Sequence, residues 1–212
     1  MPLRETVWTI VVGAGSGERF GRPKQYELLG ERRVIDIAAA TARACSDGVV
    51  VVVPPDDAER EGAIAGGATR AESVRAGLRC VPPAATVICV HDAARPFASP
   101  ALYEAVVAEV AAGADAAIPG VPVADTVKVV GPDRVVVATP ERSTLVAVQT
   151  PQAFRADVLR AAHAAGHEAT DDAALVERRG GRVVVVPGEP ANRKLTHPDD
   201  LHWARSMVEG GR

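Results

Sequence analysis

A short apolar run followed by a glycine-rich loop constrains this chain more than any other stretch. Residues Val7 to Val12 are apolar except for Thr9, which is typical of a strand buried inside a sheet. Glycines then follow at positions 13, 15, 17 and 21. Glycine lets backbone N–H groups approach a ligand, and successive N–H groups form an anion-binding concavity. Because Arg19 and Lys24 add two cations, the stretch predicts a loop that binds polyphosphate.

Two common phosphate-loop patterns do not fit these residues. The dinucleotide fingerprint G-x-G-x-x-G fails because Glu18 or Phe20 stands where its third glycine is required. The Walker A pattern fails because Lys24 lies between Pro23 and Gln25. The arrangement that remains, G-x-G-x-R followed by P-K, resembles the signature loop of nucleotidyltransferases that act on sugar or polyol phosphates. On its own, an ordinary strand-to-helix turn with surface charges explains the loop equally well.

The size and charge of the chain narrow the possible classes of protein. Its 212 residues are enough for one α/β domain, and we expect residues 1–212 to form a single domain. A formal net charge of −3 argues against nucleic-acid binding and against a polybasic membrane surface. No apolar stretch is long enough to cross a bilayer, and the N-terminal residues lack a signal-peptide pattern. We therefore expect a cytoplasmic protein with neither a membrane nor a nucleic acid as its partner.

Strands and helices are expected to alternate along most of the chain. Apolar residues at helical spacing indicate a helix, and short apolar runs between turn residues indicate a strand. Predicted helices span Arg33–Cys45, Arg70–Cys80, Pro100–Ala112, Arg155–Ala165, Ala173–Arg179 and Pro198–Glu209, and predicted strands span Val49–Val53, Thr86–His91, Ala114–Pro119 and Arg182–Val186. The alternation predicts an α/β fold, a Rossmann-like and mainly parallel sheet with helices on both faces.

Two further sites of interest follow from that order. Asp92 comes directly after a predicted strand, at the edge where open α/β sheets bind ligands. A carboxylate there, facing a polyphosphate, is suited to hold Mg²⁺, although it equally suits the cap of a turn. Gly66 and Gly67 precede the helix expected from Arg70, and a helix N-terminus favours anions and polar groups. A tight turn that needs positive φ explains this glycine pair equally well.

The segment at about residues 121–148 breaks the alternation. Two β-rich runs, Thr126–Val130 and Val135–Thr139, flank the turn sequence Gly-Pro-Asp-Arg, which is a hairpin signature. Valines point to both faces of this hairpin. We expect one face to lie against the rest of its own chain and the other to pair with a second copy, because a lone two-stranded hairpin is only marginally stable. The segment is therefore interpreted as an inserted β-hairpin arm that makes a homodimer.

Nearly the whole chain resembles one family, the 2-C-methyl-D-erythritol 4-phosphate cytidylyltransferases of the non-mevalonate isoprenoid pathway. Eight pieces match in the family order, namely GAGSGER…PKQY (13–26), GGATRAESV (66–74), VHDAARPF (90–97), ADTVK (124–128), TPER (139–142), QTPQAF (149–154), TDDAALVE (170–177) and NRKLTHPDDL (192–201). The resemblance implies a nucleotide-binding Rossmann-like domain whose β-arm joins two subunits.

The resemblance also implies roles for individual residues. The glycine loop would wrap the nucleotide with Gly13, Ala14, Gly15, Ser16 and Gly17, and Arg19 and Lys24 would lie on its phosphates. Gly67 and Ser73 would lie at the cytosine and ribose, and Asp92 beside the metal and the substrate. Thr126 and Arg142 on the arm would bind the sugar-alcohol phosphate, and Thr170 and Lys194 would complete the pocket. Arg19, Lys24 and Lys194 are the expected catalytic cations.

Three departures from the family pattern bear on these roles. The loop begins with Val12 and Gly13 where members commonly have Pro-Ala, which is tolerable if the backbone makes the contact. Ala68 replaces a residue that is often polar, so one contact to the base would come from the backbone alone. The segment between Val53 and Gly66 is short, so a peripheral strand of the family would be reduced here.

The implied reaction is attack of the 4-phosphate of methylerythritol phosphate on the α-phosphorus of CTP, with release of pyrophosphate. A phosphate oxygen is already anionic, so catalysis requires positioning and charge neutralisation rather than a general base. The pair Asp171–Asp172 therefore fits helix capping better than acid–base work. Two other functions remain open, a pentitol (ribitol 5-phosphate) cytidylyltransferase and a non-catalytic nucleotide-binding regulator. The failed dinucleotide fingerprint makes a dehydrogenase the weakest candidate.

Overall fold

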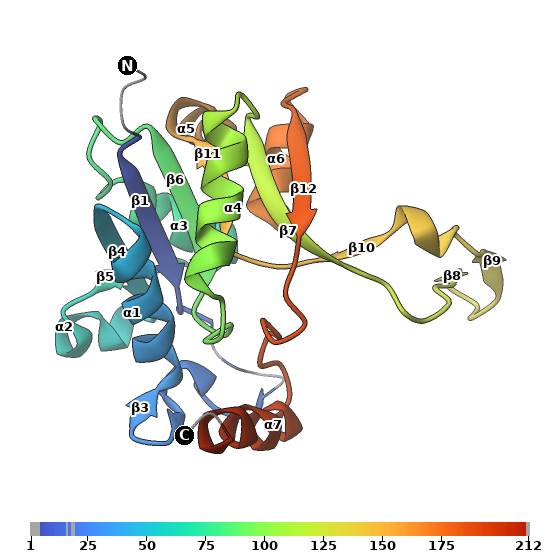
Figure 1. Cartoon of the computed structure of the whole chain (residues 1–212), viewed down its shortest axis with the longest axis horizontal. Coiled ribbons are helices and arrows are strands. Elements are labelled where there is room, and N and C mark those ends of the chain that lie inside the picture. Colours follow the sequence, from blue (N-terminus) through green and yellow to red (C-terminus); the bar gives the residue numbers. More distant parts are fainter. Residues whose placement is uncertain (1–4, 16, 18–19, 211–212) are drawn as a thin grey trace.

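An eight-stranded mixed sheet forms the centre of the molecule (Figure 1). The computed structural model describes residues 5–15, 17 and 20–210. The sheet order is β10-β7-β11-β6-β1-β4-β5, with β12 beside β7. Its strands are β1 (Val7–Val12), β4 (Gly48–Val53), β5 (Ile64–Ala65), β6 (Val87–Asp92), β7 (Ala116–Pro122), β10 (Val146–Val148), β11 (Gln152–Arg155) and β12 (Val183–Pro187).

Strand direction and register decide which residues meet at the carboxyl edge of the sheet. β1 lies between β4 and β6 and runs parallel to both, while β11 and β10 run antiparallel to their neighbours. In this register Val12 pairs with Val52 on one side and with Asp92 on the other. The end of the first strand therefore lies beside the end of β6, and the predicted mainly parallel sheet is confirmed.

Helices cover both faces of the sheet, as the alternation predicts. On one face lie α1 (Val34–Cys45) and α4 (Pro100–Ala111), whose apolar sides share one buried cluster with the sheet. On the other face lie α3 (Arg70–Leu78), α5 (Ala156–Ala164) and α6 (Asp172–Glu177), which share a second cluster. The core is built almost entirely from Ala, Val, Leu and Ile, with Phe154 and Tyr103 as its largest members.

Capping side chains set the starts of several helices. Thr69 accepts a hydrogen bond from the backbone N–H of Glu72, and the Glu72 side chain accepts one from Thr69 in return. This reciprocal pair is a capping box, and it starts α3 at the residue expected from the sequence. Ser99 caps α4 by a single bond, accepting from the backbone N–H of Leu102.

A third, smaller apolar cluster packs around the C-terminal helix, which lies below the sheet in Figure 1. It joins the C-terminal helix α7 (Pro198–Glu209) to the segment after the glycine loop, which contains the short strands β2 (Leu28–Leu29) and β3 (Arg32–Arg33). Leu29, Leu195 and Ala204 are almost fully buried in it. This cluster holds the two segments that carry Lys24 and Lys194 against the same end of the molecule.

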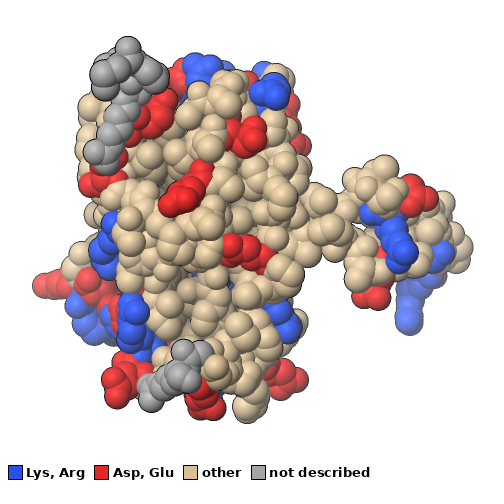
Figure 2. Space-filling view, viewed as in Figure 1, with Lys and Arg blue, Asp and Glu red and all other residues tan. Residues whose placement is uncertain are grey.

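The arm leaves the body after β7 and returns through β10 (Figures 1 and 2). Its hairpin strands are β8 (Val129–Val130) and β9 (Val136–Ala138), both shorter than the predicted runs and linked with a register irregularity. The expectation that one face packs against its own chain is wrong. Both strands are exposed throughout, and Val137 keeps 64% of its surface accessible. The arm therefore carries valines on the outside of the molecule.

Two peripheral features complete the fold. Between β4 and α3 the chain forms only the short helix α2 (Ala58–Glu61) and the two-residue strand β5, so the peripheral strand is reduced as expected. Within the part of the chain that the structure describes, no helix has the length and apolar character needed to cross a bilayer.

Candidate active site

The glycine loop turns sharply at the carboxyl end of the first strand. Gly17 has φ +74°, and a Cβ added to it would lie 2.1 Å from the carbonyl oxygen of Arg22, so only glycine fits this turn. The turn is closed by the backbone N–H groups of Phe20 and Gly21, which both donate to the carbonyl of Gly17 at 2.8 Å. Gly13 is buried, and its N–H donates to the carbonyl of Val52 at 2.7 Å.

The second glycine segment lies directly against the first. A Cβ added to Gly66 would lie 2.4 Å from the Cβ of Ala14, so the close approach of the two loops depends on this glycine. The hydroxyl of Ser73 accepts from the N–H of Gly67 at 3.2 Å and donates to the carbonyl of Thr69 at 3.0 Å. Ser73 therefore fixes the shape of the loop that precedes α3.

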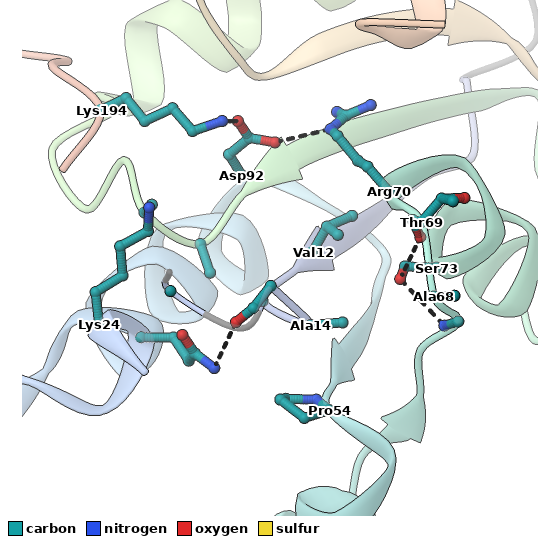
Figure 3. A pocket seen from close by; sticks show the side chains of 17 residues that line it. Val12, Ala14, Lys24, Pro54, Ala68, Thr69, Arg70, Ser73, Asp92 and Lys194 are labelled. Carbon is teal, nitrogen blue, oxygen red and sulfur yellow. Dashed lines mark hydrogen bonds and ion pairs between the residues drawn. The ribbon is translucent and has the colours of Figure 1, made fainter. Parts of the chain in front are cut away.

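These loops enclose a pocket of about 740 Å³ at the carboxyl ends of β1 and β6 (Figure 3). Its described lining combines backbone of the two loops, small side chains and four charged groups. The lining residues are Val12, Gly13, Ala14, Gly15, Gly17, Lys24, Gln25, Pro54, Gly67, Ala68, Thr69, Arg70, Ser73, Asp92, Ala93, Ala94 and Lys194. A volume of this size is within the range of small-molecule and cofactor sites.

Charges at one end of the pocket are arranged around Asp92. Lys194 Nζ lies 2.6 Å from one carboxylate oxygen, and Arg70 Nε lies 3.2 Å from the other. Figure 3 shows Lys24 and Lys194 on one side of Asp92 and Arg70 on the other. Burial alone would raise the pKa of Asp92, but the two cations outweigh it and hold this pKa well below the usual range. Asp92 is therefore a fixed anion among cations.

Buried polar side chains of Thr150 and His91 position the backbone of Asp92 on the side away from the pocket. Its backbone N–H donates to the hydroxyl of Thr150 at 3.0 Å, and that hydroxyl also lies 3.1 Å from Nδ1 of His91. The other ring nitrogen of His91 lies 3.1 Å from the carbonyl of Arg95. Burial lowers the pKa of His91 to about 4, so its imidazole is neutral at physiological pH. His91 supports the strand end and does not face the pocket as a cation.

Most of the predicted nucleotide residues come together in this pocket. Gly13, Ala14, Gly15, Gly17, Lys24, Gly67, Ser73, Asp92 and Lys194 all line it. Ser16 and Arg19 lie outside the described residues. The described lining does not include Thr126, Arg142 or Thr170. Thr126 and Arg142 are exposed on the arm, where Arg142 donates to the carbonyl of Ala124 at 2.7 Å.

Two residues in contact with Asp92 were not singled out from the sequence, and one residue behind the pocket was assigned another role. Arg70 reaches Asp92 from the first turn of α3, and its position inside the matching piece GGATRAESV was the available signal. Thr150 belongs to the QTPQ piece, but nothing in its spacing indicated a bond to the end of β6. Of the pair expected to cap α6, Asp171 does so, whereas Asp172 is buried and ion-pairs with Arg70. The capping interpretation is thus wrong for Asp172.

The donor set decides what kind of metal site is possible here. Among the described residues, no group of three His, Cys, Asp or Glu side chains is placed to hold an ion, and Asp92 is the one carboxylate lining the pocket. Mg²⁺ is commonly held by one or two carboxylates together with substrate phosphates and water. One carboxylate facing a polyphosphate cradle fits that pattern.

Glycine loops, cations and a carboxylate at the end of a parallel sheet define a nucleotide-binding enzyme of the nucleotidyltransferase class. Residues 7–210 match the family model described as 2-C-methyl-D-erythritol 4-phosphate cytidylyltransferase, and the chain belongs to that family. Membership confirms the family and the enzyme class expected from the sequence, a cytidylyltransferase.

Individual relatives agree with the family match. The chain is 48% identical to a protein named bifunctional enzyme IspD/IspF from Anaeromyxobacter sp. (strain Fw109-5), with 97% of this chain and 58% of that protein aligned. It is 43% identical to the 2-C-methyl-D-erythritol 4-phosphate cytidylyltransferase of Nocardia farcinica, covering 96% of this chain and 94% of the relative. The crystal structure of the Thermus thermophilus enzyme of that name superposes with TM-score 0.82 and 34% identity over 97% of this chain and 100% of that chain. The chain thus spans 58% of the bifunctional relative and nearly all of the other two.

Proposed function

We propose that the 740 Å³ pocket is where this chain transfers CMP from CTP to 2-C-methyl-D-erythritol 4-phosphate, giving 4-diphosphocytidyl-2-C-methyl-D-erythritol and pyrophosphate. The observation that carries the proposal is that three cations, Lys24, Arg70 and Lys194, line one pocket together with two glycine loops. Two polyanionic reactants repel each other, and cations placed around them are what the reaction requires.

CTP is assigned to the two loops. The backbone around Gly15 and Gly17 offers N–H groups to the triphosphate, whereas Gly13 anchors the loop through its bond to Val52. The loop residues Ser16 and Arg19 keep the roles implied by the family. Gly67 and Ser73 are assigned to the cytosine and ribose, at the N-terminal end of α3. Since Ala68 has no polar side chain, its contact to the base comes from the backbone.

The chemical step is assigned to positioning and electrostatics. The 4-phosphate oxygen attacks the α-phosphorus in line with the departing pyrophosphate, and no proton needs to be removed from it. Lys24 and Lys194 neutralise charge on the reacting phosphates, and Asp92 fixes the position of Lys194 through their 2.6 Å contact. Mg²⁺ bound with the triphosphate would supply further charge neutralisation, with Asp92 as its candidate protein ligand.

The second substrate is assigned in part to a partner chain. Thr126 and Arg142 do not line the pocket of their own chain, and the arm that carries them projects away from the body (Figure 1). In a two-fold dimer the arm of one chain can reach the other chain's pocket, where these side chains would bind the methylerythritol phosphate. Thr170, exposed before α6, is assigned to the same end of the substrate. Because CTP is a cytoplasmic metabolite, we place the enzyme in the cytoplasm.

A product assay tests the proposed substrate pair. The chain is incubated with CTP, Mg²⁺ and either methylerythritol 4-phosphate or ribitol 5-phosphate, and the CDP-alcohol and pyrophosphate are measured. We expect product with methylerythritol phosphate. A preference for ribitol phosphate would identify a pentitol cytidylyltransferase, and nucleotide binding without any pyrophosphate release would identify a regulator on the same fold.

A further inference from the structure

A row of charged side chains runs from the pocket into the core behind it. Lys194 contacts Asp92 at 2.6 Å, Asp92 contacts Arg70 at 3.2 Å, and Arg70 contacts Asp172 at 2.7 Å. The row ends at His163, whose Nε2 lies 2.9 Å from Asp172. Lys194, Asp92 and Arg70 line the pocket, whereas Asp172 and His163 lie among the helices that cover the sheet. The last two are buried charged or titratable groups that the proposed reaction does not use.

Arg70 is the member of this row that two carboxylates share. Its Nε faces Asp92 and one of its terminal nitrogens faces Asp172, and the contact with Asp172 is the shorter one. A guanidinium is planar and presents its donors as a rigid fork, so two bonds in different directions fix the plane of the group. Arg70 is thereby held between the pocket and the core.

Asp172 is well suited to hold Arg70 and unnecessary for starting its own helix. Its neighbour Asp171 already caps α6, by accepting from the backbone N–H of Ala174 at 3.0 Å. Only 1% of the Asp172 side chain is exposed, and such burial would raise its pKa, but Arg70 and the bond to His163 outweigh it and lower that pKa. A buried carboxylate destabilises the fold unless its partners hold fixed positions. Asp172 and Arg70 therefore have to stay paired.

We propose that Asp172 is a positioning residue, which holds the Arg70 guanidinium back from Asp92 so that Asp92 remains paired with Lys194 at the reacting phosphates. The inference rests on the proposed function, since it assumes that the reaction takes place in this pocket. Without the charge of Asp172, Arg70 pairs with Asp92 alone and competes with Lys194 for its two oxygens. The cations around the phosphates then shift, although every pocket-lining side chain is still present.

The isosteric variant Asp172→Asn tests this role. We expect kcat to fall about 10- to 100-fold, the cost of displacing a positioned group by a fraction of an ångström to an ångström. We expect the KM for CTP to stay within about 3-fold, because the loops assigned to the base and ribose do not contact Asp172. If Asp172 has only a structural role, the variant should have a lower melting temperature or a raised KM, with kcat unchanged. Either of these results would overturn the proposal.

The neighbouring carboxylate supplies a matched control. Asp171→Asn makes the same chemical change one residue away, and asparagine caps helices as well as aspartate does. Its partners are Gln152 and the start of α6, and none of them is Arg70. We expect this variant to keep kcat within about 2-fold, because it leaves the pair of Arg70 and Asp172 in place.

A double-mutant cycle with Arg70→Lys shows whether Asp172 acts through Arg70. A lysine cannot fork between two carboxylates, so the link is already lost in that background. We expect Asp172→Asn to lower the kcat of Arg70→Lys by less than about 3-fold. A full second loss would show that Asp172 acts by another route and would overturn the proposal.

Two provisions keep the experiment decisive. If Asp172→Asn does not fold, His163→Gln replaces it in the cycle, because it removes the imidazole that orients Asp172 and leaves the charge in place. We expect His163→Gln to lower kcat less than Asp172→Asn would. This loss must likewise disappear in the Arg70→Lys background. Failure of the proposed function would be seen in the wild-type chain, which would not form the expected CDP-alcohol. The cycle would then be measured with whichever alcohol phosphate the wild type accepts, so the two failures are distinguishable.

Discussion

The pocket buries charged side chains, whereas the arm exposes apolar ones. In the pocket, the Asp92 side chain is 11% exposed and its carboxylate has a cation on each side. On the arm, Val130, Val136 and Val137 are 53%, 52% and 64% exposed. One region buries charge and pairs it within the chain, whereas the other leaves more than half of the surface of these valines accessible.

This difference indicates which chain completes each region. Buried charges have to be compensated by neighbours of fixed geometry, and the pocket finds those neighbours in its own sheet and helices. Exposed apolar patches on an extended hairpin are typical of surfaces that associate with another chain. We therefore expect substitutions in the pocket to alter chemistry within one chain, and substitutions on the arm to alter how two chains work together.

The largest effect is expected for Lys24→Ala. Removing one preorganised cation from the pocket should lower kcat by about 10²–10³, the scale for loss of a single charge stabiliser. The unfolding midpoint in urea should hardly change, because this residue starts a short 3₁₀ turn of the glycine-loop segment and belongs to none of the apolar clusters. Arg22→Ala is the control, since Arg22 is in the same loop with 61% of its side chain exposed and pairs with Glu27. Near-wild-type turnover of Lys24→Ala would contradict the phosphate role of the loop.

Asp92→Asn is expected to lower activity about 10- to 100-fold, because Lys194 loses the charge that positions it. The Mg²⁺ concentration that gives half-maximal activity should rise in the same variant, since Asp92 is the candidate protein ligand. Initial rates across a Mg²⁺ titration measure both effects. If the midpoint of that titration does not move, Asp92 acts through Lys194 and Arg70 alone.

A mixture of two inactive variants tests whether the arm serves the partner's pocket. Lys24→Ala damages a pocket and Arg142→Ala damages an arm, so a mixed dimer has one site with both defects and one with neither. Co-refolding equal amounts should restore roughly a quarter of all sites, since half of the dimers are mixed. Native mass spectrometry checks that mixed dimers form. A mixture that stays inactive despite them would mean that Arg142 acts in its own chain or has no role.

The smallest effect on folding is expected on the arm. Val137→Lys should change the free energy of unfolding of the monomer by at most about 0.5 kcal/mol, because the side chain contacts little of its own chain. Phe154→Ala should cost about 3–5 kcal/mol, because that ring is fully buried between the sheet and its helices. Urea denaturation of dilute, monomeric protein measures both. Dimer dissociation, followed by analytical ultracentrifugation, should become easier only with Val137→Lys.

Local patterns were sufficient for most elements of the fold. The helix predicted from Pro198 to Glu209 is observed with those bounds, and the helix predicted from Arg33 to Cys45 begins one residue later. These predictions depend on neighbouring residues in the sequence, such as a proline in a first turn or apolar side chains at helical spacing. The turn at Gly17 is similar, because its positive φ and its close approach to Arg22 are set within a few residues.

The arrangement of charges in the pocket was decided by the tertiary structure. Arg70 and Asp172 are 102 positions apart, as are Asp92 and Lys194, and no local pattern indicates which cation will meet which carboxylate. The pair Asp171–Asp172 shows what a local pattern leaves open. The two adjacent aspartates have the same sequence signal, and only the fold makes Asp171 a helix cap and Asp172 a buried ion-pair partner. The sequence determined where most of the long strands, helices and loops lie, because those choices are local. Which side chains share a pocket, and that the arm points away from it, depends on contacts between distant segments, whose energies exist only once the chain has folded.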